Sequence, residues 1–377
     1  MHIKLTPYRT LIPIRKSFFG TYVKNHSEVM NTKGKMKAAV LYKPRDMRIE
    51  EIEIPQISSN EVLIEMKRVG ICGSDIHFYL HGRIASYVVK KPLILGHECS
   101  GEVVEVGEEV SNIKPGQRVV IEPGFVCGKC FYCRLGRYNL CREVKFYGAP
   151  HFHGAFAEYV TAPEQNVYPI PKNVSYEEGA MIEPLAVGMM AAKMGKIGVN
   201  DAVAVLGAGP IGQMILQAAK VYGAPEIYVT DIIDYRLEYA KRYGASEIIN
   251  AAKESVVNRI KDLTDGEGVD VAIDASGAPS AIRQAVDIVK PGGRIVLVGY
   301  PPDDVPLPLA EIISKELSLQ GIHRYANVYP AAIKAVSSGK ATVKPYVTHI
   351  FPFERILEGF ETHIKKIGNP IKIQIAV

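Results

Sequence analysis

The 377-residue sequence lacks any run of about eighteen consecutive apolar residues, the length that a membrane-spanning helix needs. It has only six cysteines, too few for a disulfide scaffold, and their clustering favours thiolate chemistry in a reducing compartment. It also lacks internal repeats and low-complexity segments. We therefore expect a soluble, cytoplasmic protein that is long enough for two domains of ordinary size.

Outside its N-terminal end the chain has almost no net charge. The formal net charge is +5, but residues 1–36 contribute +6, so that residues 37–377 sum to −1. A folded body without a basic excess gives no electrostatic reason to expect a nucleic acid partner. The charged residues of the segment 1–36 are Lys4, Arg9, Arg15, Lys16, Lys24, Lys33, Lys35 and the single acid Glu28.

Residues 1–36 also lack helical periodicity, and we expect them to form a basic, disordered extension. One interpretation is a transit-like segment, although it has only Ser17 and Ser27 where such segments are usually rich in serine. The interpretation that we favour is a start codon assigned too far upstream. Met30 and Met36 both lie just before the first clear strand pattern.

From residue 37 to about residue 170 the pattern is typical of an irregular β domain. Short runs that are rich in valine or alternate in polarity are each closed by a turn signal of Gly, Pro or Asn. The predicted strands are residues 36–42, 61–70, 101–107, 117–123 and 156–163.

The character of the sequence changes after residues 176–195, which we expect to be helical. Residues 201–249 and 268–300 alternate apolar strands, glycine-containing turns and amphipathic helices. Such alternation predicts a parallel sheet covered by helices on both faces, and hence an α/β protein with a doubly wound sheet. From about residue 325 the pattern ends, so we expect the tail to pack back on the first domain. The predicted domains are 37–184 together with 325–377, and 185–324.

The stretch "VAVLGAGPIG" carries a G-x-G-x-x-G motif at Gly207, Gly209 and Gly212. The motif is weak alone, but here it follows an apolar strand, opens a helix and precedes Asp231 by nineteen residues. Gly207 would allow the tight turn, Gly209 the approach of the pyrophosphate, and Gly212 close helix–strand packing. The free N–H groups at the helix N-terminus would bind the phosphates. We expect a dinucleotide site.

Asp231 favours NAD over NADP. A carboxylate there can accept hydrogen bonds from the ribose hydroxyls but would repel a 2′-phosphate, and Ile232 and Ile233 follow it instead of a basic residue. The alternative for Asp231 is an ordinary turn residue. Arg236 is placed to lie over the adenine, although it could equally be a solvated helix residue.

The loop "CGKCFYCRLGRYNLC" carries Cys127, Cys130, Cys133 and Cys141. Four thiolates so close together match a tetrahedral structural zinc site with no open position. Redox disulfides are the alternative, but four crowded cysteines fit one ion better than two bridges.

Cys72 and His97 predict a second zinc ion. With one carboxylate they would supply the three protein ligands and the open position that are expected of a catalytic zinc. Cys99, two residues after His97, would point elsewhere on a strand that begins there, and we interpret it as a small core residue.

These motifs give the chain a family resemblance. "GHE", "CGSDIH" and the four-cysteine loop resemble the medium-chain zinc-dependent alcohol dehydrogenases over essentially all of residues 37–377. "HGRIASYVVKKPLILGHE", "IEPLAVG", "HRYANVYP" and "VKPYVTHIFPFERILEGFE" resemble the polyol branch, the sorbitol (L-iditol) and xylitol dehydrogenases. The resemblance implies a GroES-like β domain, a Rossmann domain that binds NAD, two zinc ions per chain and a homotetramer.

The resemblance also implies that a glutamate joins Cys72 and His97 on the catalytic zinc. The candidates are Glu98 and Glu183, and the sequence does not choose between them. A site with one zinc ion, the Cys72 thiolate, neutral His97 and one ionised glutamate is formally neutral. A second ionised glutamate would make the site anionic, unless this glutamate shuttles a proton. We therefore expect one direct ligand and one neighbour.

In the family, Ser74 and His77 match the positions that relay the proton of the alcohol to solvent while hydride passes to the nicotinamide. The alternative interpretation is a turn hydroxyl for Ser74 and a helix-cap residue for His77. The polyol would be recognised by Arg324, Tyr325 and Glu183, because guanidinium and phenol groups donate hydrogen bonds of fixed geometry. Phe78 departs from the family, because sorbitol dehydrogenases often have tyrosine after the relay histidine. The implied cofactor contacts are Ile211, Asp231, Arg236, Val298, Gly299, Tyr300 and Arg324.

The leading hypothesis is an NAD-dependent zinc polyol dehydrogenase. Dehydrogenases for 2,3-butanediol, sugars or inositol, and L-threonine are the alternatives within the family. The threonine enzymes resemble "CGTD" where this chain has "CGSD", which argues against them. A non-catalytic NAD sensor should have lost a metal ligand, yet Cys72, His97, Glu98 and Glu183 are all present.

Overall fold

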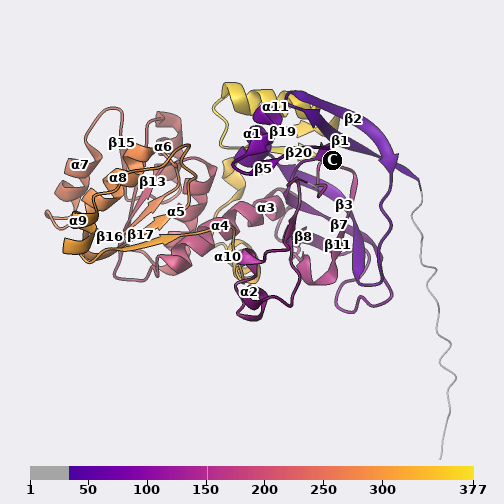
Figure 1. Ribbon diagram of the computed structural model, residues 1–377, viewed down its shortest axis with the longest axis horizontal. Coiled ribbons are helices and arrows are strands. Elements are labelled where there is room, and N and C mark those ends of the chain that lie inside the picture. Colours follow the sequence, from indigo (N-terminus) through magenta and orange to yellow (C-terminus); the bar gives the residue numbers. More distant parts are fainter. Residues whose placement is uncertain (1–33, 151) are drawn as a thin grey trace, which may run out of the picture. The chain divides into compact units, whose positions relative to one another are not determined.

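The computed structural model describes residues 34–150 and 152–377 (Figure 1). Most of residues 1–36, expected to be an extension, lie outside this part of the chain. The first strand begins at Lys35, two residues before the expected start of the β domain, and Met36 is buried in it. None of the helices in the described residues combines the length and the apolar character needed to cross a membrane.

Strands from the first half of the chain and from its C-terminal end form a mixed sheet in which β3 (Glu61–Gly70) is the central strand. It pairs antiparallel with β7, β11 and β20, so that residues more than 300 positions apart lie side by side. The strands, in order across the sheet, are β12 (Val167–Pro169), β8 (Arg118–Ile121), β7 (Glu98–Val106), β3 (Glu61–Gly70), β20 (Lys372–Ala376) and β19 (Val347–Pro352), and β11 (Tyr159–Pro163) adds to β3.

Smaller sheets surround this one. β1 (Lys35–Lys43) lies between β2 (Asp46–Glu53) and β6 (Leu93–Ile94), while β4 (Arg83–Ile84) pairs with β5 (Tyr87–Val88) and β9 (Gly124–Phe125) with β10 (Lys145–Phe146). The expected strands at 36–42, 61–70, 101–107, 117–123 and 156–163 correspond to β1, β3, β7, β8 and β11. The associated helices are α1 (Gly73–His81), α2 (Phe131–Arg134), α3 (Tyr176–Ala180) and α11 (Ile356–Lys365).

The second sheet is entirely parallel, as the alternating pattern predicted. Its strands occur in the order β15 (Glu247–Asn250), β14 (Glu226–Asp231), β13 (Ala202–Leu206), β16 (Val269–Asp274), β17 (Val289–Leu297) and β18 (Ser318–Gly321). This is the 3-2-1-4-5-6 order of a Rossmann fold, in which ligands bind where the order reverses, between the first and fourth strands. Here that point lies between β13 and β16. The connecting helices are α5 (Pro210–Tyr222), α6 (Asp234–Arg242), α7 (Val256–Leu263), α8 (Pro279–Ile288) and α9 (Leu309–Ser314).

The expected helix at 176–195 is broken in two. α3 ends at Ala180, and α4 (Ile182–Met194) begins after Met181. α4 packs in one apolar cluster with α5 and with α10 (Tyr329–Ser337), on the parallel sheet. The tail was expected to pack on the first domain from about residue 325, but α10 packs with the parallel sheet. The chain returns to the first sheet only through β19 and β20, and these yellow C-terminal strands lie beside the indigo N-terminal ones in Figure 1.

Candidate active site and metal centres

Cys72, His97 and Glu98 lie together although they come from two separate segments. One ligand atom of each residue lies within 4.8 Å of the others, and His97 and Glu98 are buried. The group forms where β3 ends and β7 begins, since Gly70 pairs with Glu98 in the antiparallel ladder. A side chain at Gly70 would collide with the Glu98 carboxylate. A thiolate, an imidazole and a carboxylate are the donors that zinc prefers, so the residues fit the metal that the sequence predicted.

Asp75 connects the start of α1 to His97. Its carboxylate accepts hydrogen bonds from the backbone N–H groups of Cys72 at 2.9 Å and Gly96 at 3.1 Å, and lies 3.7 Å from His97 Nδ1. Although burial opposes protonation, the Asp75 carboxylate raises the pKa of His97 well above its usual value. A carboxylate behind an imidazole is the usual way to fix the orientation of a metal-binding histidine.

Glu98 forms an ion pair with Lys372, a residue that the sequence analysis did not identify. Lys372 Nζ donates to both carboxylate oxygens, at 2.7 and 2.8 Å, and to the carbonyl oxygen of Ile71 at 3.2 Å. Both side chains are almost fully buried. Buried charges need such pairing, and in this arrangement the ion pair lies directly beside the metal group.

Glu183, in the first turn of α4, has a different environment. Its Oε1 accepts a hydrogen bond of 2.6 Å from the hydroxyl group of Tyr325, and both side chains are buried. Burial raises the pKa of Glu183 to about 7, while His97 and the tyrosine hydrogen bond act in the opposite direction. Glu183 is not part of the three-residue ligand group. Of the two candidate glutamates, Glu98 therefore lies closer to Cys72 and His97.

Cys99 lies in the apolar core of the first sheet. It is 2% exposed, and burial raises the pKa of its thiol far above its usual value. Its burial confirms the interpretation of Cys99 as a small core residue.

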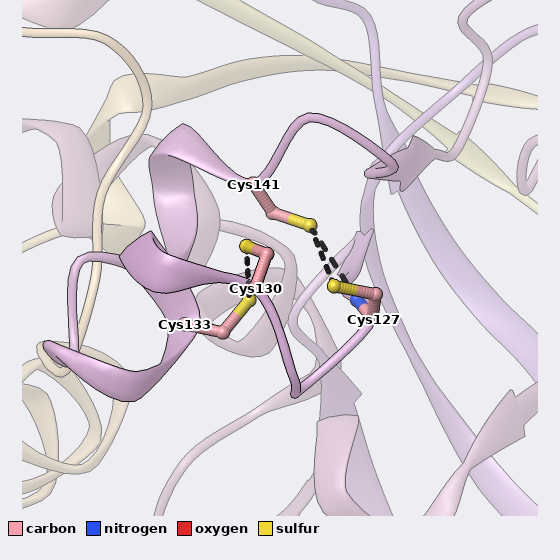
Figure 2. A group of neighbouring side chains, drawn as sticks. All are labelled: Cys127, Cys130, Cys133 and Cys141. Carbon is pink, nitrogen blue, oxygen red and sulfur yellow. Dashed lines mark hydrogen bonds between the residues drawn. The ribbon is translucent and has the colours of Figure 1, made fainter.

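The four cysteines of the loop 127–141 converge on one point, as Figure 2 shows. Their sulfur atoms lie within 4.8 Å of one another, with Cys130 3.5 Å from Cys133 and Cys127 3.6 Å from Cys141. All six cysteines are free, so no disulfide competes for these sulfurs. The backbone N–H of Cys133 lowers the pKa of Cys130 to about 6, which favours the thiolate that zinc binds. Four sulfur donors leave no open position, and the set fits a structural zinc.

The glycine-rich turn follows β13 and begins α5. Gly207 has φ of +107°, a conformation that favours glycine, and Gly209 is the N-cap residue of α5 with Pro210 at its first position. A side chain at Gly212 would collide with the carbonyl oxygen of Gly207. The turn therefore presents the N-terminus of α5 at the point where the strand order reverses, as a dinucleotide site requires.

Asp231 ends β14 and supports this turn. One carboxylate oxygen accepts a hydrogen bond of 2.7 Å from the N–H of Ala208, and the other accepts from Ile232 and Ile233 at 2.7 and 3.0 Å. Arg236 Nη1 lies 3.8 Å from the carboxylate. The acid thus lies beside the glycine-rich turn, where the sequence argument put it.

A single cavity of about 200 Å³ connects the two groups of residues. Its lining includes Cys72 and Glu98 of the metal group, Gly209 and Ile211 of the glycine-rich turn, and Arg236. A nucleotide on the turn and a metal on the cysteine would therefore be neighbours. We refer to this space as the cofactor cavity.

The other predicted residues occupy more varied places. Ser74 is half-buried and His77 exposed, both on α1, whereas Phe78 is buried in the core of the first sheet. Val298, Gly299 and Tyr300 follow β17, and the Tyr300 hydroxyl lies 2.7 Å from His323 Nδ1. Arg324 has φ of +55°, and its guanidinium lies 5.0 Å from the centre of the Phe146 ring.

Sequence reasoning missed Asp75 and Lys372. Asp75 had a local signal, because an acid three residues after an N-cap position is typical of a capping box. Lys372 had no such local signal, because a lysine between Ile371 and Ile373 is typical of the exposed face of a strand with alternating polarity. Here both faces of β20 are buried.

Two family profiles match the chain. Residues 58–172 match the alcohol dehydrogenase GroES-like domain, and residues 210–338 match the zinc-binding dehydrogenase domain. The two matches correspond to the β domain and to most of the parallel sheet with its helices.

Individual relatives match most of the chain. The sorbitol dehydrogenase of Bacillus subtilis is 43% identical over 341 residues, which cover 90% of this chain and 97% of that protein. The L-idonate 5-dehydrogenase of Vitis vinifera is 40% identical over 347 residues, covering 89% and 93%. A solved Escherichia coli oxidoreductase of unknown specificity superposes with a TM-score of 0.88 at 40% identity, covering 91% of this chain and 99% of the other.

Proposed function

The chain belongs to the zinc-dependent alcohol dehydrogenase family, and from this premise we propose that it oxidises a secondary hydroxyl group of a polyol, such as sorbitol or xylitol, to a ketone with NAD. One observation carries the proposal. The cofactor cavity joins a metal-ligand group to a dinucleotide turn, so that a metal-held hydroxyl group and a nicotinamide would meet in it. The names of the sorbitol and L-idonate relatives support a polyol as the substrate.

We assign the catalytic metal to Cys72, His97 and Glu98, with Glu183 as the neighbour that completes the site. When bound there, zinc supplies a Lewis acid that makes the substrate hydroxyl group more acidic. The four loop cysteines would hold the structural zinc. Both assignments rest on the donor sets and their distances.

The chain's own side chains would orient the polyol and remove its proton. Glu183 keeps one carboxylate oxygen free of Tyr325 and can accept a substrate hydroxyl there. Tyr325, which donates to Glu183, and the adjacent Arg324 are the side chains that we propose for the other hydroxyl groups. Ser74 and His77, in the first turns of α1 after Cys72, would pass the proton toward solvent, which the exposure of His77 supports.

The cofactor would be NAD, held between the glycine-rich turn and the loop after β17. Asp231 supports this choice, because in residues 34–150 and 152–377 no cation pairs with it more closely than Arg236 at 3.8 Å, and its charge would repel a 2′-phosphate. The contacts that we propose are Ile211, Asp231, Arg236, Val298, Gly299, Tyr300 and Arg324.

We also propose a homotetramer of two-domain subunits, located in the cytoplasm. The domains would be 37–184 with 325–377, and 185–324. β18 is the edge strand of its sheet, and the large apolar side chains of Leu309 and Ile313 on the neighbouring helix are exposed, which supports a subunit contact there. The unpaired state of the six cysteines supports a reducing compartment.

A substrate panel read by NADH absorbance tests the proposal. It comprises sorbitol, xylitol, ribitol, L-arabinitol, meso-2,3-butanediol, inositol and L-threonine, each with NAD and with NADP. We expect turnover of at least one linear polyol with NAD. Oxidation of butanediol or threonine without any polyol turnover would overturn the substrate assignment.

A further inference from the structure

A second cavity, of about 590 Å³, lies next to the metal group and is lined by positive charges. Arg142, Lys145 and Arg324 contribute to its wall together with His323, and its wall also includes Phe146, whose ring lies beside that of His97. No Asp or Glu of the described chain lines it. We call it the cationic cavity.

The charges in this cavity have no anionic partner. Within residues 34–150 and 152–377, none of the ion pairs involves Arg142, Lys145 or Arg324. Arg142 and Lys145 are exposed, and their charged groups lie 5.8 and 6.0 Å from the ring centres of Tyr132 and Phe152. Arg324 donates a single long hydrogen bond, 3.5 Å to the carbonyl oxygen of Asn139. Three like charges around one space repel one another, and an anion would relieve that repulsion.

The cavity borders the reacting centre. The Phe146 ring, which lines it, lies 5.4 Å from the His97 ring. Arg324 immediately precedes Tyr325, whose hydroxyl group contacts Glu183. A substrate with one hydroxyl group at the metal group would therefore reach the cationic cavity beside Phe146.

The backbone that carries Arg324 is held firmly. Asn139 Nδ2 donates to the carbonyl oxygen of His323 at 2.9 Å, the N–H of Asn327 donates to the Tyr138 hydroxyl at 2.8 Å, and Asn327 Nδ2 donates to Gly136 O at 2.7 Å. These bonds link the segment 323–327 to the cysteine loop. The position of Arg324 is thus built into the fold, unlike that of a free surface cation.

The phosphates of the cofactor do not account for these charges. The glycine-rich turn and the N-terminus of α5 line the cofactor cavity, and the cationic cavity shares none of its lining residues. Of the three cations only Arg324 is also a proposed cofactor contact, so Arg142 and Lys145 remain available to the substrate.

We propose that the cationic cavity is a subsite for an anionic group at the far end of the polyol, a terminal carboxylate or phosphate. This inference rests on the proposed polyol dehydrogenase function and narrows its substrate class. The reaction is unchanged: a secondary C–H bond yields its hydride to NAD, the hydroxyl proton leaves for solvent, and the anionic group takes no part in bond breaking. Guanidinium and ammonium groups bind both kinds of anion through charge-assisted hydrogen bonds.

Three substrates with the same hydroxyl configuration test the subsite: sorbitol, sorbitol 6-phosphate and L-gulonate, which carries a carboxylate in place of the C6 hydroxymethyl group of sorbitol. We expect kcat/KM of the zinc-loaded enzyme to be about tenfold higher for at least one anion than for sorbitol, since one charge-assisted hydrogen bond contributes about this factor. The two anions distinguish a phosphate from a carboxylate subsite.

The double variant Arg142→Gln/Lys145→Gln should remove this preference and leave kcat/KM for sorbitol within about twofold. Lys90→Gln/Lys91→Gln removes the same charge from exposed residues outside the cavity and should keep the preference. If the first variant misfolds, the preference of the wild-type enzyme is measured at increasing ionic strength instead. A preference due to these cations should shrink as ionic strength rises.

The possible results separate the two proposals. Turnover of sorbitol with no advantage for either anion, or an advantage that survives in the Arg142/Lys145 variant or is insensitive to salt, overturns the subsite and leaves the dehydrogenase intact. No turnover of any of the three, together with none in the wider polyol panel, overturns the proposed function itself.

Discussion

Lys372 and Glu98 form a buried ion pair in which the ammonium group donates to both carboxylate oxygens, at 2.7 and 2.8 Å. The pair changes the charge balance expected from the sequence. With a divalent cation, the Cys72 thiolate and two ionised glutamates, the group would carry one negative charge, which Lys372 neutralises. Glu98 and Glu183 can therefore both be ionised without making the site anionic, which the sequence argument had disfavoured.

Removing Lys372 tests this relationship. Lys372→Met should lower the free energy of unfolding by about 3–5 kcal/mol, because it leaves a buried carboxylate without its partner. Lys372→Met/Glu98→Gln should recover much of that loss. Urea unfolding, with the zinc content of each variant measured in parallel, checks both. If Lys372→Met were as stable as the wild type, the result would contradict a close pairing of Lys372 with Glu98.

The two metal groups should separate by mutation. Cys127→Ser should lose one of two zinc ions per chain and much of the stability, because the four sulfurs tie the two ends of the loop 127–141 together. Cys72→Ser should lose the other ion and the activity while the unfolding transition stays near that of the wild type. Metal analysis and thermal unfolding give the result. Loss of both ions in either variant would argue against independent sites.

Asp231 should control the choice of cofactor. Asp231→Ser/Ile232→Arg removes the repelling charge and adds a cation, so the ratio of kcat/KM for NAD to that for NADP should fall by about a hundredfold or more. Asp231→Asn is the milder comparison, because it keeps an acceptor for Ala208. An unchanged ratio in the double variant would show that the ribose is bound elsewhere.

His363 should make stability depend on pH. Burial lowers the pKa of this side chain to about 4, below its value of 6.5 in an unfolded chain. The neutral ring therefore contributes stability that is fully present above pH 6.5 and is lost as pH falls toward 4. From pH 7 to pH 4.5 the linked loss is about 2 kcal/mol.

His363→Gln should flatten this part of the stability curve, as measured by urea unfolding at several pH values. His81→Gln, which changes an exposed histidine, is the matched control and should leave the curve unchanged. Parallel curves for His363→Gln and the wild type would contradict the assignment.

Local patterns predicted much of the fold. The alternation of strand and helix predicted the parallel sheet, and the spacing of glycines and of loop cysteines predicted two groups that the structure brings together. These signals are local, because a turn, a helix start or a cysteine loop is formed by neighbouring residues.

The remaining features depend on distant contacts. β20 pairs with β3 across about 300 residues, and only that pairing places Lys372 on Glu98. The break at Met181 is an exception, because Gly179 and Pro184 flank it and were a local signal that the sequence analysis did not use. The cationic cavity combines residues of the cysteine loop with Arg324, which no local pattern connects.

The most direct test of the central claim follows the hydride itself. Sorbitol carrying deuterium on its secondary carbons is oxidised with NAD by the zinc-loaded protein, and the NADH is analysed by mass spectrometry and NMR. The account predicts one deuterium at C4 of the nicotinamide for each ketose formed, and none with Cys72→Ser. Ketose formation without deuterium in NADH, or equal activity of Cys72→Ser, would contradict it.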